Sequence, residues 1–144
     1  MSCVYDVANY ILQKRGEMTT LKLQKLAFYC QAYSLAWDGE PLFDEEFQAW
    51  ANGPVCPELF QSHKGRFRVC EDAYAGYNAV FSEDAIETMN AIIDAYGEKT
   101  ANWLKDMTHD ELPWQEARRG CAPGEPSATI ITKESMQAYY GQKS

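Results

Sequence analysis

The sequence lacks any long uninterrupted hydrophobic run. Lys, Gln, Asp or Gly interrupts every apolar stretch before it reaches the about 18 residues that a membrane-spanning helix requires. The first six residues also lack the basic start, the apolar run and the small-residue cleavage site of a secretory signal. We therefore expect no membrane association and a cytoplasmic protein.

Histidine is scarce, and the cysteines are spaced for neither a zinc site nor a disulfide framework. His63 and His109 are far apart in the sequence and do not form a ligand-spaced helical pattern. The cysteines are odd in number and contain no C-x-x-C pair. They are Cys3, Cys30, Cys56, Cys70 and Cys121. We expect mostly free thiols, no metal ion and no cofactor.

Phosphate-binding and hydrolase motifs are also absent from the sequence, which contains no G-x-x-x-x-G-K-[ST], G-x-G-x-x-G or G-x-S-x-G. One catalytic alternative uses Cys56 as a nucleophile, because a following helix N-terminus would lower its pKa, with His63 or His109 as base. His109 also lies beside Asp110 and Glu111, as an acid–base residue can. We favour packing roles for Cys56 and His109, and we expect no enzyme.

Basic residues are few relative to acidic ones. The chain has 13 Lys and Arg against 21 Asp and Glu, which gives a net charge of -8. Residues 81–116 contain nine acids against Lys99 and Lys105. An acidic surface repels phosphate backbones, so we expect no direct nucleic-acid binding. The acidic segment is either a solvated helix face or a docking surface for a basic partner.

The patterns that are present predict a mainly α (α+β) fold in one domain spanning residues 1–144. A chain of 144 residues that is 46% hydrophobic can bury one core. Apolar spacing and caps predict helices over residues 3–15, 19–38, 57–64, 82–96, 98–107 and 113–119, and from residue 132. Alternation predicts a short strand at 47–51 that pairs with 129–131, and a loop with a brief alternating stretch at 66–81.

The helix predicted at residues 19–38 is apolar on more than one face. One stripe contains Leu23, Leu26, Ala27, Cys30 and Trp37, and a second contains Leu21, Phe28 and Leu35. A helix with two apolar faces packs on both sides, so we expect it at the centre of the fold. Lys22 and Lys25, on one face with Tyr29, are expected to form its solvated strip.

Three short blocks of sequence resemble the signature of one family. They are T-T-L-K-L-Q-K-L-A-F-Y at residues 19–29, A-W-A-N-G-P-V-C-P at 49–57 and T-H-D-E-L-P-W at 108–114. Their order and separation are similar to those of the Panacea domain of SocA-like antitoxins, although Ala27 and Phe28 replace the usual Leu-Tyr pair. The residues that carry the resemblance are Thr19, Lys22, Leu23, Gln24, Lys25, Leu26, Tyr29, Trp50, Gly53, Pro54, Val55, Thr108, His109, Pro113 and Trp114.

The resemblance implies an antitoxin and no enzymatic activity. Such domains neutralise unrelated growth-inhibiting toxins by direct contact, and many are encoded by phages or mobile elements. One relative also delivers its toxin to the ClpXP protease. The resemblance therefore implies a cognate protein toxin as partner and, as an alternative, an adaptor role with a ClpXP-type protease. It also implies that the signature residues determine the fold, so we expect the toxin contacts outside them.

Candidate partner contacts come from charge and from the expected solvated strip. A negatively charged helix face suits a basic substrate-binding face on a toxin. The candidate residues are Lys22, Lys25, Glu83, Asp84, Glu87 and Asp94. The sequence predicts neither the identity of the toxin nor the oligomeric state.

Overall fold

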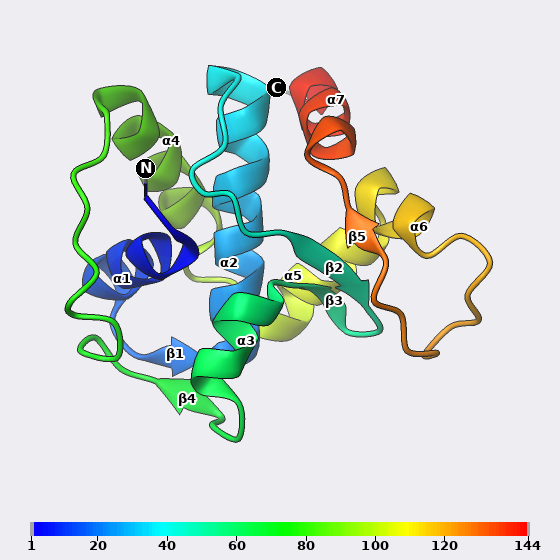
Figure 1. Ribbon diagram of the computed structural model, residues 1–144, viewed down its shortest axis with the longest axis horizontal. Helices are drawn as coiled ribbons and strands as arrows, with labels where there is room; N and C mark the ends of the chain where they lie inside the picture. The colour runs from blue at the N-terminus through cyan, green and yellow to red at the C-terminus, as the bar shows by residue number, and fades with distance from the viewer. Residues whose placement is uncertain (1, 144) are drawn as a thin grey trace.

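Helix α2 (Thr20–Tyr33) lies at the centre of the fold in the computed structural model, which describes residues 2–143 (Figure 1). Thr19 begins the helix, because its hydroxyl accepts a hydrogen bond from the backbone N–H of Lys22 at 3.2 Å. The chain continues as a π-helical turn, η1 (Ser34–Asp38), which ends at Gly39 with a φ of 73°. The predicted helical span is confirmed.

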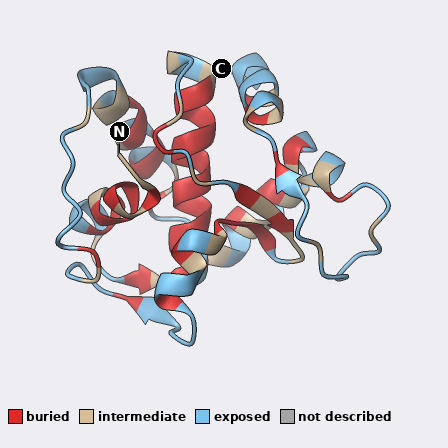
Figure 2. Ribbon diagram, in the orientation of Figure 1, coloured by how far each residue is buried: buried red, intermediate tan, exposed pale blue. Residues whose placement is uncertain are grey.

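Helices that come before and after it in the chain pack around α2 (Figure 1). They are α1 (Val4–Arg15), α4 (Glu83–Tyr96), α5 (Ala101–His109) and α7 (Lys133–Lys143). Two shorter helices, α3 (Pro57–His63) and α6 (Leu112–Ala117), each have a proline in the first turn. Figure 2 shows α2 buried along most of its length, which confirms that it packs on both sides.

A three-stranded antiparallel sheet lies beside the helices, with β2 (Phe47–Trp50) between β3 (Gly53–Val55) and β5 (Ile130–Ile131). Phe47 is opposite Ile131, so both apolar side chains point into the core. The predicted pairing of these two segments is confirmed. The predicted fold class is confirmed as well, because the chain is mainly helical with small sheets.

A second sheet joins the start of α2 to the segment after α3. Its two strands, β1 (Met18–Thr19) and β4 (Arg68–Val69), pair antiparallel. Strands of two residues are too short for a period to be recognised, which is why the sequence indicated only brief alternation in residues 66–81. This pairing fixes the turn after α3 against the N-terminus of α2.

Two large side chains of the central helix are less buried than their stripes predicted. Leu21 is 45% exposed, because the first turn of α2 extends to the surface beside the turn after α3. Trp37 is 43% exposed at the other end, where it packs on Tyr33 with ring centroids 4.8 Å apart. The neighbouring helices therefore cover the middle of the central helix more than its ends.

Candidate functional site

The three sequence blocks meet at the turn between β2 and β3. Lys25 from α2 and Thr108 from α5 both lie against Gly53. A Cβ atom added at Gly53 would lie 2.8 Å from Lys25 Cε and 3.2 Å from Thr108 Oγ1. Gly53 also has a φ of 111°, which disfavours any residue with a side chain. Glycine is required here both by the turn and by the close approach of its neighbours.

The ammonium group of Lys25 is buried at this meeting point. The residue is 1% exposed, and its Nζ has no hydrogen-bond partner among residues 2–143. Loss of hydration, together with the charge of Lys105, lowers the pKa of Lys25 to about 8. The predicted solvated strip is therefore wrong for Lys25 and also for Tyr29, which is fully buried, whereas Lys22 is half-buried. Helix α5 and β3 cover Lys25, and α7 covers Tyr29.

The side chain of Gln24 connects the first block to the second. Its Oε1 accepts a hydrogen bond from the backbone N–H of Cys56 at 2.8 Å, and its Nε2 donates to the Cys56 carbonyl at 3.3 Å. Nε2 is also 3.0 Å from His63 Nε2. If Gln24 donates this hydrogen bond, His63 Nε2 carries no proton and accepts it. Burial lowers the pKa of His63, which also favours the neutral imidazole. Gln24 thus fixes both the end of β3 and the end of α3.

The third block connects α6 to the sheet. The rings of His109 and Trp114 stack with centroids 3.8 Å apart, and Trp114 Nε1 donates to the carbonyl of Trp50 at 2.9 Å. The hydroxyl of Thr108 donates to the carbonyl of Lys105 at 2.7 Å. Thr108 therefore bonds back into α5 rather than into the turn that follows. Trp114 anchors that turn to β2.

His109 is the second buried group without a partner. Its Nε2 accepts and donates no hydrogen bond within the described part of the chain. Burial, followed by the charge of Lys105, lowers the pKa of His109. The imidazole is therefore mostly neutral at pH 7, and its clearest contact is the stack on Trp114. This geometry is that of a packing residue.

Arg118 holds the segment that follows α6. Its Nη1 donates to the carbonyl of Ala49 at 2.8 Å, while its Nη2 donates to the carbonyls of Ala122 and Glu125. The guanidinium also lies 5.1 Å from the centroid of the Trp114 ring. One buried side chain thus joins the middle strand of the sheet to the loop before β5. No local pattern of residues around Arg118 indicates this role.

Glu111 is a further residue that sequence reasoning missed. Its Oε1 accepts hydrogen bonds from the hydroxyls of Tyr29 at 2.6 Å and Tyr140 at 2.7 Å. Lys143 Nζ lies 3.9 Å from its other carboxylate oxygen. Burial raises the pKa of Glu111 despite these partners. No sequence signal indicated it, because Tyr29 was expected on the solvated strip. A buried tyrosine hydroxyl usually has a hydrogen-bond partner, but the burial of Tyr29 appears only in the structure.

The environment of Cys56 does not activate its thiol. The residue is fully buried at the start of α3, and burial raises its pKa to about 11. The thiol is thus protonated at neutral pH, although the sequence alternative required a lowered pKa. His63 Nε2 is engaged with Gln24 rather than with this sulfur. The candidate nucleophile and the candidate base therefore have the geometry of packed residues.

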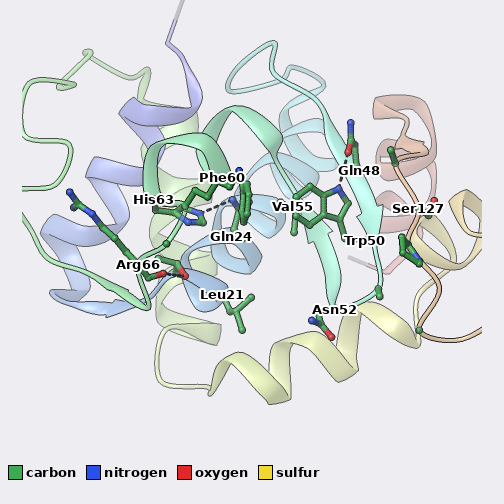
Figure 3. A pocket seen from close by; sticks show the side chains of 17 residues that line it. Leu21, Gln24, Gln48, Trp50, Asn52, Val55, Phe60, His63, Arg66 and Ser127 are labelled. Atoms are coloured by element: carbon green, nitrogen blue, oxygen red, sulfur yellow. Dashed lines mark hydrogen bonds between the residues drawn. The ribbon is translucent and has the colours of Figure 1, made fainter.

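A groove with a volume of about 660 Å³ runs along the β2–β3 hairpin (Figure 3). Its walls come from the start of α2, the hairpin, the end of α3 with the following turn, and the loop at 124–128. Figure 3 shows Gln24 joined to His63 towards one end and Trp50 joined to Gln48 towards the other. Gln24, Trp50 and Val55 belong to the sequence blocks, so these blocks build a concave surface as well as a core.

The remaining predicted residues are divided between core and surface. Leu23, Leu26 and Tyr29 are fully buried in α2, while Pro54 and Pro113 are also buried. The acidic candidates Glu83, Asp84, Glu87 and Asp94 are all exposed on α4. The structure therefore keeps these four carboxylates together on one helix, away from the residues that line the groove.

Two further features bear on the kind of site present. The described part of the chain holds no cluster of three or more His, Cys, Asp or Glu side chains placed to bind a metal ion. No helix within residues 2–143 has the length and the apolar character to cross a bilayer.

Comparison with known proteins adds a family to this geometry. The model of a family described as "Antitoxin SocA-like, Panacea domain" matches residues 23–115, which include most of the first block and all of the other two. A relative, Antitoxin SocA from Caulobacter vibrioides (strain NA1000 / CB15N), is 25% identical over 130 residues, covering 79% of this chain and 69% of the relative. No solved structure matches the chain.

Proposed function

Because the chain belongs to the SocA-like antitoxin family with a Panacea domain, we propose that it neutralises a cognate growth-inhibiting toxin by binding it directly. The resemblance read from the sequence is confirmed by the family match. The proposal rests mainly on the fact that all three blocks converge on the β2–β3 hairpin. Their polar side chains there hydrogen-bond to, or pack against, other residues of the protein. Such a scaffold suits a binding module acting in the cytoplasm.

The exposed acids of α4 are one proposed contact surface. Glu83, Asp84, Glu87 and Asp94 all face solvent, and none of them forms an ion pair with another described residue. Uncompensated surface carboxylates attract a basic partner and raise its rate of association. A basic substrate-binding face on the toxin would supply the matching charge.

Co-expression with the toxin encoded beside this chain tests the proposal. We expect growth to be rescued and a complex to survive gel filtration. Reversing three acids, as Glu83→Lys/Asp84→Lys/Glu87→Lys, should weaken the complex and increase its sensitivity to salt. The control Glu40→Lys/Glu71→Lys/Glu134→Lys makes the same change in net charge at exposed sites outside both α4 and the residues that line the groove. Absence of both rescue and complex with the wild-type chain would refute the proposed function.

The same strains distinguish occlusion from delivery to a protease. If this chain acts as an adaptor, toxin abundance should fall in cells that contain a ClpXP-type protease and remain constant in cells that lack it. If it acts by occlusion, toxin abundance should be the same in both strains while growth is rescued. Immunoblotting of the toxin after translation is stopped measures the difference. We propose occlusion as the main mechanism and delivery as the alternative.

A further inference from the structure

We propose that the groove along the β2–β3 hairpin binds a short segment of the partner that carries an apolar side chain next to a carboxylate. This inference rests on the proposed function, because the partner is taken to be the toxin. It adds a contact whose charge is opposite to that of α4. Two contacts of opposite sign would fix the orientation of the partner as well as its affinity.

Apolar side chains are exposed along the groove and at its rim. Leu21 is 45% exposed inside it, and Phe67, next to the groove residue Arg66, is 71% exposed. Trp50 and Phe60 are half-buried in the wall, with ring centroids 5.0 Å apart. Clustered aromatic and aliphatic side chains beside a concavity are typical of protein contact sites. An apolar side chain of the partner can therefore be buried here.

The charge of the groove is opposite to that of the whole protein. Lys64 lines the groove and is exposed. Arg66 is also exposed at its edge, where its guanidinium extends away from the other labelled side chains (Figure 3). No described Asp or Glu lines the groove, although the chain has 21 acids. Neither basic residue forms an ion pair with a carboxylate in the described part of the chain. A carboxylate on the bound segment would supply the missing partner. Two cations in a chain of net charge -8 do not suit a nucleic acid.

The walls of the groove are held in place before anything binds. Gln24 is fixed by its hydrogen bonds to Cys56, and Trp50 Nε1 donates to Gln48 Oε1 at 2.8 Å. The carbonyl of Trp50 is in turn bonded by Trp114. A preformed site avoids the entropy of ordering its own side chains on binding. The sequence blocks would therefore preserve one docking surface as well as the fold.

A phage-displayed library of random short peptides, selected on the intact protein, provides the first test. Selected peptides should combine an aromatic or aliphatic residue with Asp or Glu. Fluorescence anisotropy should then show binding weakened about tenfold or more by Leu21→Glu, Phe67→Glu and Lys64→Glu/Arg66→Glu. Using both Leu21→Glu and Phe67→Glu protects the test against one variant that fails to fold.

Matched controls separate the groove from general charge effects. Val80→Glu changes an apolar residue that is 99% exposed outside the groove, and Lys14→Glu/Arg119→Glu repeats the charge reversal at exposed sites elsewhere. Both controls should bind the selected peptides as the wild type does. Selection of no peptide, selection of basic peptides, or equal losses in groove and control variants would overturn the inference.

The same variants, tested for complex formation with the toxin, separate this inference from the proposed function. A wild-type chain that forms no complex refutes the proposed function, while the peptide experiment still tests the groove. A toxin complex that is unaffected by the groove variants refutes the groove as the toxin site and leaves the proposed function standing. A toxin complex weakened by the groove variants and retained by both controls supports the inference.

Discussion

The Nζ atom of Lys25 lies buried against Gly53, so close that a Cβ atom at Gly53 would come within 3.3 Å of it. The two residues belong to different sequence blocks, and no hydrogen bond from the ammonium compensates for its burial within residues 2–143. A buried and unpaired charge costs free energy of folding. The pair therefore gives direct predictions about stability.

Replacing Lys25 by Met should stabilise the protein at pH 7. The fall of the pKa from 10.5 to about 8 corresponds to about 3 kcal/mol, which is the upper limit of the expected gain. Methionine has a similar length and leaves no charge to be buried. Urea unfolding of both proteins measures the difference. A variant less stable than the wild type would show that the ammonium has a favourable interaction in the folded state.

The advantage of Lys25→Met should depend on pH. The folded-state pKa of Lys25 is below the unfolded value, so protonation favours the unfolded state and wild-type stability rises between pH 8 and 10.5. The gap between the two proteins should be full at pH 7 and shrink across that window. Other titrating groups are common to both proteins and largely cancel in the difference. A difference in stability between the two proteins that is constant with pH would contradict a lowered pKa for Lys25.

Gly53→Ala should destabilise the fold by about 2–4 kcal/mol, because it combines a strained φ with contact on Lys25 Cε. Gly120→Ala is the matched control, since Gly120 has a φ of 90° with open space around it. That change should cost about 1–2 kcal/mol from backbone strain alone. Thermal unfolding of both variants tests whether Gly53→Ala is the more destabilising change. Equal costs would mean that the Lys25 side chain moves aside without penalty.

Tyr140→Phe should destabilise the protein by about 1.5–3 kcal/mol, because it removes a hydrogen bond to the buried carboxylate of Glu111. The half-buried Tyr139 gives the control Tyr139→Phe, which leaves both hydrogen bonds to Glu111 Oε1 intact. Tyr139→Phe should change the free energy of unfolding, measured in urea, only slightly.

The cost of Tyr140→Phe should increase with pH. Burial raises the pKa of Glu111 above its unfolded value, so its contribution is full below about pH 4.5 and is lost as pH rises through the folded pKa. Removing the Tyr140 hydroxyl raises that pKa further, so the variant should lose more stability than the wild type as the pH rises above about 4.5. Parallel pH profiles would show that Tyr140 does not stabilise the ionised form of Glu111.

Thiol alkylation should follow burial. Cys70 is exposed, whereas Cys30 and Cys56 are fully buried and burial raises the pKa of both thiols. Iodoacetamide at mildly alkaline pH should therefore modify Cys70 in the folded protein, and Cys30 and Cys56 after denaturation. Mass spectrometry of the digested protein identifies the modified residues. Rapid modification of Cys56 in the folded protein would revive the nucleophile alternative.

Much of the fold could be predicted because its signals are local. Thr19 and Ser82 each accept a hydrogen bond from the helix that follows, and two of the predicted helices begin at these residues. The apolar faces of α2 indicated a central helix, and the β-branched Ile130–Ile131 pair indicated a strand. Each of these features depends on neighbours within one helical turn or one strand, which the sequence contains.

The site was harder to predict because distant segments build it. Lys25 has the spacing of a surface residue, and its burial results from Gly53 and Thr108, far along the chain. The groove combines four separate segments, so no single one carries a pattern for it. The three blocks did indicate which segments matter. Their meeting at one hairpin required the tertiary structure.

Arg118 allows the loop before β5 to vary independently of the rest of the protein. The loop residues 122–128 are mostly exposed, and the guanidinium secures them through backbone carbonyls, which every amino acid has. Substitutions there would alter one wall of the groove at little cost to folding, because few of their side chains touch the core. A lineage that retains Arg118 can therefore change what its groove recognises while the scaffold remains the same.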